Sequence, residues 1–380
     1  MSKSRQLSPA EIEAFGAEVD AIKQRHLADV GERDATYIRK IEKAVRYTEI
    51  AGRGLLMAGI FPPAFVAGAA LLGVSKILDN MELGHNVMHG QYDFMQDPRF
   101  SGQTFEWDTW CTSDNWRYSH NYMHHTYTNV LGKDHDIGYG VLRIFPEQKW
   151  EPRFLANPVM AVTLAVFFEN LLALQTLETE KVLAGEKTWK EWFKQGKPTF
   201  RKGFKQAAKD YVFFPLLAGP FFLPVLAGNF VANIMRNLWT FTIIFCGHFT
   251  EDAEVFALET LENETRGQWY LRQMRGSSNL TGGKLFHIMS GNLSHQIEHH
   301  LFPEVPAHRY AEMSVEMREI AKRYGQNYNS ASLVKQFSTV AGRILRHALP
   351  STPKKALTVP AAEEKVSPAG AAGAAQHTPR

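Results

Sequence analysis

The sequence predicts an all-α integral membrane protein with about four transmembrane helices in two hairpins and a cytoplasmic helical cap that holds a two-metal site. Two observations lead to this fold class. Long uncharged stretches, interrupted by proline, can cross a bilayer and turn back. Three clusters of histidine lie beyond these stretches, and they must meet in one folded unit to share metal ions.

Composition excludes several other classes of protein. The net charge of +3 is too small to indicate binding to nucleic acid. The two cysteines, Cys111 and Cys246, lie far apart, which excludes a disulfide framework, a zinc ribbon and a cysteine-ligated iron–sulfur site. The mean hydropathy of −0.26 is typical of a soluble protein, but it averages long apolar stretches with charged ends.

The chain begins with polar helices. Ser8-Pro9-Ala10-Glu11 combines an N-cap residue, a proline in the first turn and a capping-box glutamate, so it predicts a helix start. We expect residues 1–44 to form cytoplasmic helices that are either solvated or lie on the membrane surface.

The first hairpin is predicted from an uncharged run, Gly54–Val74, which is long enough to span a bilayer. Pro62 and Pro63 interrupt it, because proline lacks a backbone donor and disfavours helix at the preceding residue. We therefore expect one helix to end near Phe61 and the next to start near Ala64 and to continue to the first histidine cluster. A single span of Gly54–Val74 is the alternative.

The second hairpin is predicted from residues 211–247, an apolar stretch long enough for two crossings. Before it, residues 178–210 form a predicted loop with nine basic and five acidic residues, which the positive-inside rule places in the cytoplasm. All histidine clusters then share one side if the apolar residues 154–177 lie at the interface or in the cytoplasmic body. Arg236 is costly inside this stretch, so it should face a cavity or a partner.

The domain organisation follows from these segments. Residues 45–325 hold the hairpins and all three histidine clusters, so they form the main domain. Residues 326–349 predict a C-terminal helix. Residues 350–380 are rich in Pro, Ala, Gly and Lys without a core-forming pattern and predict a disordered tail.

The histidine clusters have the spacing of helical metal ligands. Residues i and i+4 lie on one helix face, and a histidine at i+5 points about 100° further round, toward a neighbouring ion. Eight imidazoles are too many for one ion, so we predict two. These eight are His85, His89, His120, His124, His125, His295, His299 and His300.

The third cluster can be read in two registers. His295 with His299 and His300 gives H-x-x-x-H-H, whereas Gln296 with the same pair gives Q-x-x-H-H. Imidazole is the better ligand, so His295 is favoured. The same residues contain H-x-x-E-H, a zinc metalloprotease pattern with Glu298 as the general base, but a protease would leave the other two clusters unexplained.

Further candidates surround the clusters. His248 stands at the end of the last apolar stretch, where an additional ligand would fit. Ligating histidines usually donate their second N–H to a carboxylate or carbonyl. The carboxylates expected to support the histidines in this way are Glu82, Asp134, Asp136 and Glu298.

The three clusters, with their order and the hydrophobic stretches between them, resemble the membrane fatty acid desaturase family over about residues 45–325. Gly84–Gly90 looks like the first histidine box of the family and Trp116–His125 like the second. Asn292-Leu-Ser-His-Gln-Ile-Glu-His-His-Leu-Phe-Pro303 is similar to the third. Asn129–Asp134 and the third box are most similar to actinobacterial-type acyl-CoA or acyl-lipid desaturases.

This resemblance implies two Fe ions and an O2-dependent removal of two hydrogens from a fatty acyl chain, giving a cis double bond. The eight clustered histidines would be ligands, and His248 would be the ninth. Some relatives carry an Asn one turn before that histidine, where this chain has Ile244. A fatty acyl hydroxylase on the same scaffold is the alternative outcome. Trp107, Trp110 and Trp116 are candidates for the wall of an acyl channel.

The reaction also implies partners. The chain has no cysteine cluster and no His-Pro-Gly-Gly motif of a fused cytochrome b5, so we expect an external ferredoxin-, rubredoxin- or cytochrome b5-like donor with its reductase. The acyl group could be linked to CoA, a carrier protein or lipid. The basic segment 178–210 docks the donor or the carrier, or only sets topology and touches anionic lipid. We expect a multi-pass protein whose active site faces the cytoplasm.

Overall fold

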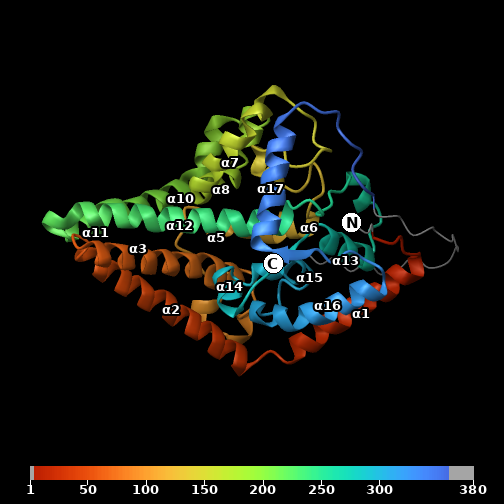
Figure 1. The fold of residues 1–380 in the computed structure, drawn as a ribbon, viewed down its shortest axis with the longest axis horizontal. Helices are drawn as coiled ribbons and strands as arrows, with labels where there is room; N and C mark the ends of the chain where they lie inside the picture. Colours follow the sequence, from red (N-terminus) through yellow and green to blue (C-terminus); the bar gives the residue numbers. More distant parts are fainter. Residues whose placement is uncertain (1–3, 359–380) are drawn as a thin grey trace.

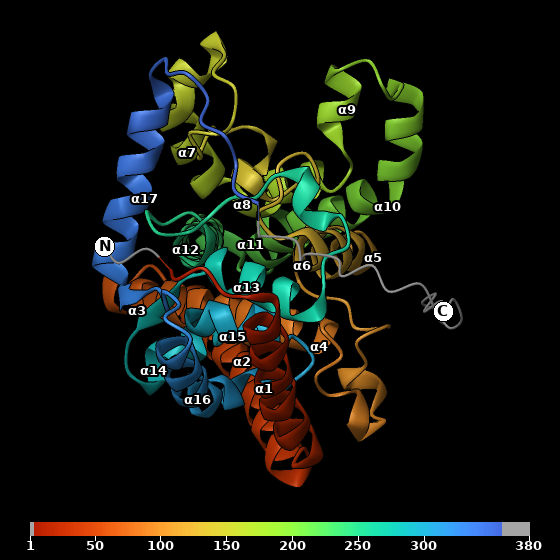
Figure 2. The same ribbon diagram turned by 90° about the vertical axis from the view of Figure 1, so that its right-hand side faces the viewer.

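The computed structural model describes residues 4–358, and this part of the chain is mainly helical. Two helical hairpins converge at the left of Figure 1, and a broad helical cap forms the right side. Figure 2 looks onto this cap, with the hairpins behind it. The sheet in the described residues is small: β1 (Asn279–Thr281) pairs in parallel with β2 (Ser330–Ser332).

The first helix, α1 (Pro9–Ala28), starts as predicted. The Ser8 side chain accepts from the Glu11 backbone N–H, and the Glu11 side chain accepts from the Ser8 N–H, which completes the capping box. Phe15 of α1 is fully buried in a cluster with residues of the third-box region, such as Tyr310. The N-terminal helix is therefore part of the cap core rather than a separate surface element.

The first hairpin is confirmed. Helix α2 (Glu32–Met57) ends before a turn at residues 58–61, and α3 (Pro62–Ile77) returns beside it. The two backbones approach so closely that a Cβ on Gly68 would lie 3.0 Å from the carbonyl oxygen of Gly52. The alternative of one span across residues 54–74 is wrong, because the prolines start a new helix instead of kinking the old one.

Helix α3 continues without a break toward the first histidine cluster. A π-helical turn, η1 (Leu78–Gly84), leads into α4 (His85–Met88), so the chain is helical from Pro62 to Met88. This matches the expectation that the second arm of the hairpin extends to the metal-ligand candidates. The extra residue of a π-turn rotates the following histidines relative to the apolar face of α3.

The second cluster lies on a short helical segment between loops. This segment is α5 (Ser113–Trp116), the π-helical η4 (Arg117–His124) and α6 (His125–Tyr127). Short 3₁₀ turns flank it: η2 (Asp93–Met95), η3 (Pro98–Phe100), η5 (Ile137–Gly140) and η6 (Pro152–Ala156). Then α7 (Asn157–Val166) and α8 (Phe168–Gln175) meet at a bend of 102° and lead to α9 (Thr179–Leu183).

The basic segment 178–210 is mostly helix, not the predicted loop. Helix α10 (Trp189–Ala208) starts at a capping box of Thr188 and Glu191 and buries Trp192, Gly196 and Thr199 on one face. Its lysines occupy the other face, so the charge count concealed an amphipathic pattern. The prediction was wrong because it weighed net charge above periodicity.

The second hairpin follows as predicted. The π-turn η7 (Lys209–Phe213) and α11 (Phe214–Leu217) extend α10 to a turn at η8 (Gly219–Phe221), and α12 (Phe222–His248) returns beside α11. Gly219 has a φ of 57°, a conformation that glycine adopts without a Cβ clash.

Within residues 4–358, two helical stretches are long and apolar enough to cross a membrane: Pro62–Met88 and Gly219–His248. The bent pair α7–α8 would be a third if it counts as one broken span. The outer arms of the hairpins, α2 and α10–α11, carry charges along much of their length. The two hairpins are therefore present, whereas four crossings remain a prediction.

The rest of the chain builds the cap. Its helices are η9 (Leu258–Leu261), α13 (Arg266–Arg275), α14 (Lys284–Met289), η10 (Leu293–His295), α15 (Gln296–Leu301), η11 (Ala307–Arg309), α16 (Tyr310–Arg323) and α17 (Leu333–Ala348). Helix α17 lies within the predicted C-terminal helix. Residues 350–358 of the predicted tail are ordered against the cap, since the Leu357 backbone N–H donates to Val255 and its carbonyl accepts from Ala257. The rest of that tail, 359–380, lies outside the described residues.

Candidate metal centre

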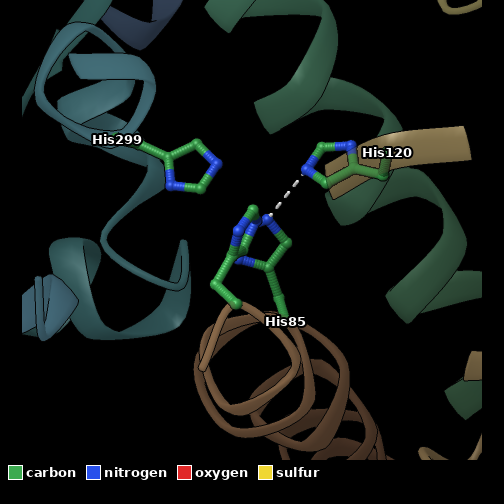
Figure 3. A group of neighbouring side chains, drawn as sticks. His85, His120 and His299 are labelled. Carbon is green, nitrogen blue, oxygen red and sulfur yellow. Dashed lines mark hydrogen bonds between the residues drawn. The ribbon is translucent and has the colours of Figure 1, made fainter. Parts of the chain in front are cut away.

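The fold brings the three histidine clusters together beneath the cap. The first is delivered by the end of the Pro62–Met88 helix, the second by η4 and α6, and the third by α15. Figure 3 shows His85, His120 and His299, from three different elements, pointing toward one another. The Nε2 atoms of His85 and His120 lie 3.3 Å apart.

The histidines form two adjacent groups. In the first group, ring nitrogens of His85, His89, His120 and His299 all lie within 4.8 Å of one another. In the second group, the same holds for His124, His248 and His300. His125 links the two groups, because its ring centroid lies 4.7 Å from that of His299 and 4.4 Å from that of His300. Each of these sets of nitrogens could hold a metal ion.

The chemistry of this donor set fits transition-metal ions. Both ring nitrogens of His125 and of His299 are buried without a hydrogen-bond partner, as is Nε2 of His89. Buried polar atoms in folded proteins are nearly always satisfied, so unpaired nitrogens on neighbouring histidines are consistent with a metal site. Neutral imidazole suits iron, zinc, copper and nickel.

Neighbouring residues fix the orientation of several rings through Nδ1. Asp134 accepts from His124 Nδ1 at 3.0 Å, and its other oxygen accepts from the backbone N–H of Asn129 at 2.7 Å. Gln273 Oε1 lies 3.0 Å from His300 Nδ1. These contacts leave Nε2 of each ring directed into the centre, where His124 and His300 lie 3.3 and 3.1 Å from His248 Nε2.

Burial keeps most of these rings neutral. It lowers the pKa of His120, His125, His299 and His300 well below the ordinary value of 6.5. His124 differs, because Asp134 and Asp136 outweigh the effect of burial and raise its pKa to about 9. Neutral imidazole is the form that binds a metal ion, so most of the site is ready at pH 7, and binding at His124 would release a proton.

His295 does not join the other histidines, which corrects the favoured register of the third cluster. Its ring stacks on His287 at 4.6 Å, on the far side of η10. Gln296 takes the inner position, with its side-chain nitrogen 2.9 Å from His248 Nε2. His295 adopts a non-helical backbone (φ −105°, ψ 56°), so the i, i+4 relation to His299 does not exist. This placement also leaves the H-x-x-E-H zinc site unassembled.

Two of the four predicted supporting carboxylates lie close to rings of the two histidine groups. Asp134 does so directly, and Asp136 Oδ2 lies 3.7 Å from Nδ1 of both His120 and His124. Glu82 instead accepts from the Tyr37 hydroxyl at 2.6 Å and from Asn292 at 2.9 Å. Glu298 accepts from Asn279 and from Tyr328, each at 2.8 Å. Glu298 Oε2 also lies 3.9 Å from Nδ1 of His295, but this ring is outside the two histidine groups.

The three tryptophans have different roles. Trp116 stacks on His120, with ring centroids 4.4 Å apart, and both Trp116 and Trp107 line a pocket next to the centre. Trp110 packs over Gly203 of α10, where a Cβ would lie 2.6 Å from its ring, and is not among the lining residues.

Some residues at the site were not predicted. Asn86 holds His85 Nδ1 at 3.1 Å, and Thr128 and Gln273 both contact His300. Asn86 stands inside the first box and could have been suspected. Gln273 carries no signal in the sequence, because only the packing of α13 against α15 brings it to the ring.

A narrow pocket opens from the histidines. About 810 Å³ of empty space lies between its walls, part of it open to solvent, and this space is narrow. The surface that faces the pocket is mainly apolar, and His85, His120, His124 and His248 are among the lining residues. Such a shape accommodates a single unbranched apolar chain beside the metal-ligand candidates.

Comparison with known proteins identifies the family to which the chain belongs. Residues 61–332 match the family described as fatty acid desaturase. A "NADPH-dependent stearoyl-CoA 9-desaturase" of Mycobacterium tuberculosis is 44% identical over 348 residues, which cover 90% of this chain and 82% of the relative. A "sn-1 linoleoyl-lipid 6-desaturase" of Synechocystis is 28% identical over 72% of this chain and 77% of the relative.

The matched region contains the second hairpin, the returning arm α3 of the first hairpin, all three histidine clusters and the pocket. More than half of the chain matches the family, and a relative above 40% identity extends over nearly all of it. The chain is therefore a fatty acid desaturase and belongs to the fatty acid desaturase family.

Proposed function

We propose that this enzyme introduces a cis double bond into a fatty acyl chain in an O2-dependent reaction at two histidine-bound iron ions. The observation that carries the proposal is a narrow pocket whose lining includes histidines of both groups, His85 and His120 of the first and His124 and His248 of the second. The reaction consumes O2, two electrons and two protons, and it yields the double bond and two water molecules.

The iron ligands in this proposal follow the two groups. They are His85, His89, His120, His124, His125, His248, His299 and His300, with Gln296 in the place predicted for His295. Two iron ions bound there would supply the oxidant that removes hydrogen from an unactivated carbon. Asp134 holds the His124 ring, and Trp116 covers His120 from the pocket side.

The substrate side of the proposal rests on the pocket and the relatives. The Mycobacterium relative is named for stearoyl-CoA, so an acyl-CoA is the first substrate to test, ahead of acyl-carrier or acyl-lipid forms. Electrons would come from an external donor and its reductase, with NADPH as the source named for that relative. The two hairpins would anchor the chain, with four crossings and the histidines on the cytoplasmic side.

Expression in a host that lacks the product tests the activity. We expect a new monounsaturated fatty acid in the host lipids and iron in the purified protein, because the proposal requires both. Gas chromatography with mass spectrometry gives the product and its double-bond position, and elemental analysis gives the metal. A new hydroxy fatty acid would instead favour the hydroxylase, and unchanged lipids with iron-free protein would contradict the proposal.

The third-box register gives a second, independent prediction. Gln296→Ala is expected to lower desaturation by about 10- to 100-fold, because it removes a polar group in contact with His248. His295→Ala is expected to retain iron and most of the activity, since its ring stacks on His287 outside both groups. Turnover and iron content of the two purified variants decide between the registers. Loss of iron in His295→Ala, with iron and activity retained in Gln296→Ala, would instead identify His295 as the ligand.

A further inference from the structure

The pocket follows one face of α12 away from the histidines. The lining residues on this helix are His248, Ile244, Thr240 and Arg236, each four positions from the next, together with Asn237. Twelve residues of helix rise about 18 Å, so the lining residues of α12 are spread over about this length of the helix axis. Arg236 is the member of this row farthest from the metal-ligand candidates.

Arg236 is a buried charge at that far end. Its side chain is 2% exposed and forms an ion pair with Glu169 of α8, whose side chain is 11% exposed. Both residues line the pocket. Oε2 of Glu169 is buried without a hydrogen-bond partner, so this carboxylate depends on Arg236 to compensate its charge. A charge within a membrane-spanning segment is costly and usually marks a functional position.

The pair is held in place by the bend between α7 and α8. Asn237 accepts from the Arg236 guanidinium at 3.1 Å and donates to the carbonyl oxygen of Val166 at 2.8 Å, at the end of α7. Glu169 follows two residues after the bend at Phe167. The ion pair therefore lies where three helices meet and cannot move aside without breaking these contacts.

We propose that the Arg236–Glu169 ion pair closes the acyl pocket at its far end and sets the longest fatty acyl chain that the enzyme accepts. This rests on the proposed function, in that the pocket holds the acyl chain. A pocket this narrow admits a chain only end first, so the methyl end is the part that reaches the pair. A chain that is too long would have to push apolar carbon against a buried ion pair, which displaces polar contacts without replacing them.

The test replaces both charges together, with Arg236→Leu and Glu169→Leu in one variant. A single replacement would strand the partner charge, whereas apolar replacement of a whole buried pair is often neutral or stabilising. The iron-loaded wild type and variant are assayed with stearoyl-CoA and with homologues two and four carbons longer. We expect the ratio of turnover on the longer chain to turnover on stearoyl-CoA to rise at least about tenfold in the variant.

A binding measurement keeps the result independent of turnover. The affinity of the same acyl-CoAs for each protein is measured by calorimetry. In the wild type, affinity should stop increasing with chain length once the chain reaches the ion pair. In the variant, affinity should continue to increase for the longer chains. Arg236→Lys is the matched control: it retains a cation beside Glu169 and is expected to keep the wild-type length limit.

The outcomes separate the two proposals. If the wild type desaturates none of the chains, the proposed function fails. If it desaturates them but the double variant has the same length limit in both turnover and binding, the ion pair does not close the pocket. A shift of the limit in Arg236→Lys equal to that in the double variant would also overturn the inference, because it would show that side-chain size rather than charge is responsible.

Discussion

Replacing His299 with alanine is expected to remove iron from the protein and to abolish formation of the double bond. His299 belongs to the first histidine group and also to the set that includes His125 and His300, so its loss weakens both metal positions. Its two ring nitrogens are buried without a hydrogen-bond partner, so no other contact compensates for the lost ligand. Elemental analysis of the purified variant and the fatty-acid profile of the expressing host measure the two effects.

The matched control for this experiment is His287→Ala. His287 lies in the same region of the cap, but its Nδ1 contacts Ser294 at 2.7 Å and its Nε2 contacts the Gly282 carbonyl at 2.9 Å, outside both groups. We expect the control to keep its iron and its activity. A His299→Ala protein that retains full iron and turnover would show that the two groups do not hold the catalytic metals.

Replacing Asp34 with asparagine is expected to destabilise the cap by about 3–5 kcal/mol, the usual effect of breaking a buried ion pair. Asp34 is fully buried near the start of α2 and forms two 2.7 Å hydrogen bonds with Arg309 of η11, which is itself buried. The pair joins the N-terminal helices to the segment that follows the third box. Thermal unfolding in detergent measures the loss.

The same pair predicts a pH dependence. Burial alone would raise the pKa of the Asp34 carboxyl, but hydrogen bonds from Arg309 and His308 outweigh it and hold the pKa below its ordinary value of 3.8. A lowered carboxyl pKa stabilises the fold above the unfolded-state value, so this contribution is present above about pH 4 and is lost as the pH falls further. The loss should be absent from the Asp34→Asn protein.

Asp29→Asn is the control for the buried pair. Asp29 also contacts Arg309, at 2.8 Å, but its side chain is 74% exposed, so its removal should cost no more than about 1 kcal/mol. Equal effects of the two substitutions would mean that the Asp34–Arg309 pair contributes little beyond an ordinary surface contact.

The hairpins were predictable because their signals are local. Proline is favoured in the first turn of a helix, so Pro62 and Pro63 predict a helix start. The proline- and glycine-rich residues near Gly219 interrupt a helix. The amphipathic α10 was missed, although its pattern is also local, because its lysines were counted as charge and not placed on a helix face. The bend at Phe167 carries no proline or glycine of its own, and packing against α12 accompanies it.

The clustered histidines could be assigned to metal binding from the sequence because their spacing already carries the chemistry. The choice between His295 and Gln296 could not be made this way, because it depends on where the backbone becomes helical. The structure starts α15 at Gln296, and that one-residue difference turns His295 toward His287. The part of Gln273 in holding His300 depends in the same way on the packing of α13.

The sequence by itself determined that this protein carries many imidazoles at helical spacing beside proline-broken apolar helices, and that Arg236 required a partner or a cavity. Only the tertiary structure decided which rings share a group, that Glu169 is the partner of Arg236, and that both residues line the pocket. The physical reason is distance along the chain. Periodicity and capping act within a few residues, whereas these contacts join residues from separate helices whose relative placement is set by packing of the whole chain.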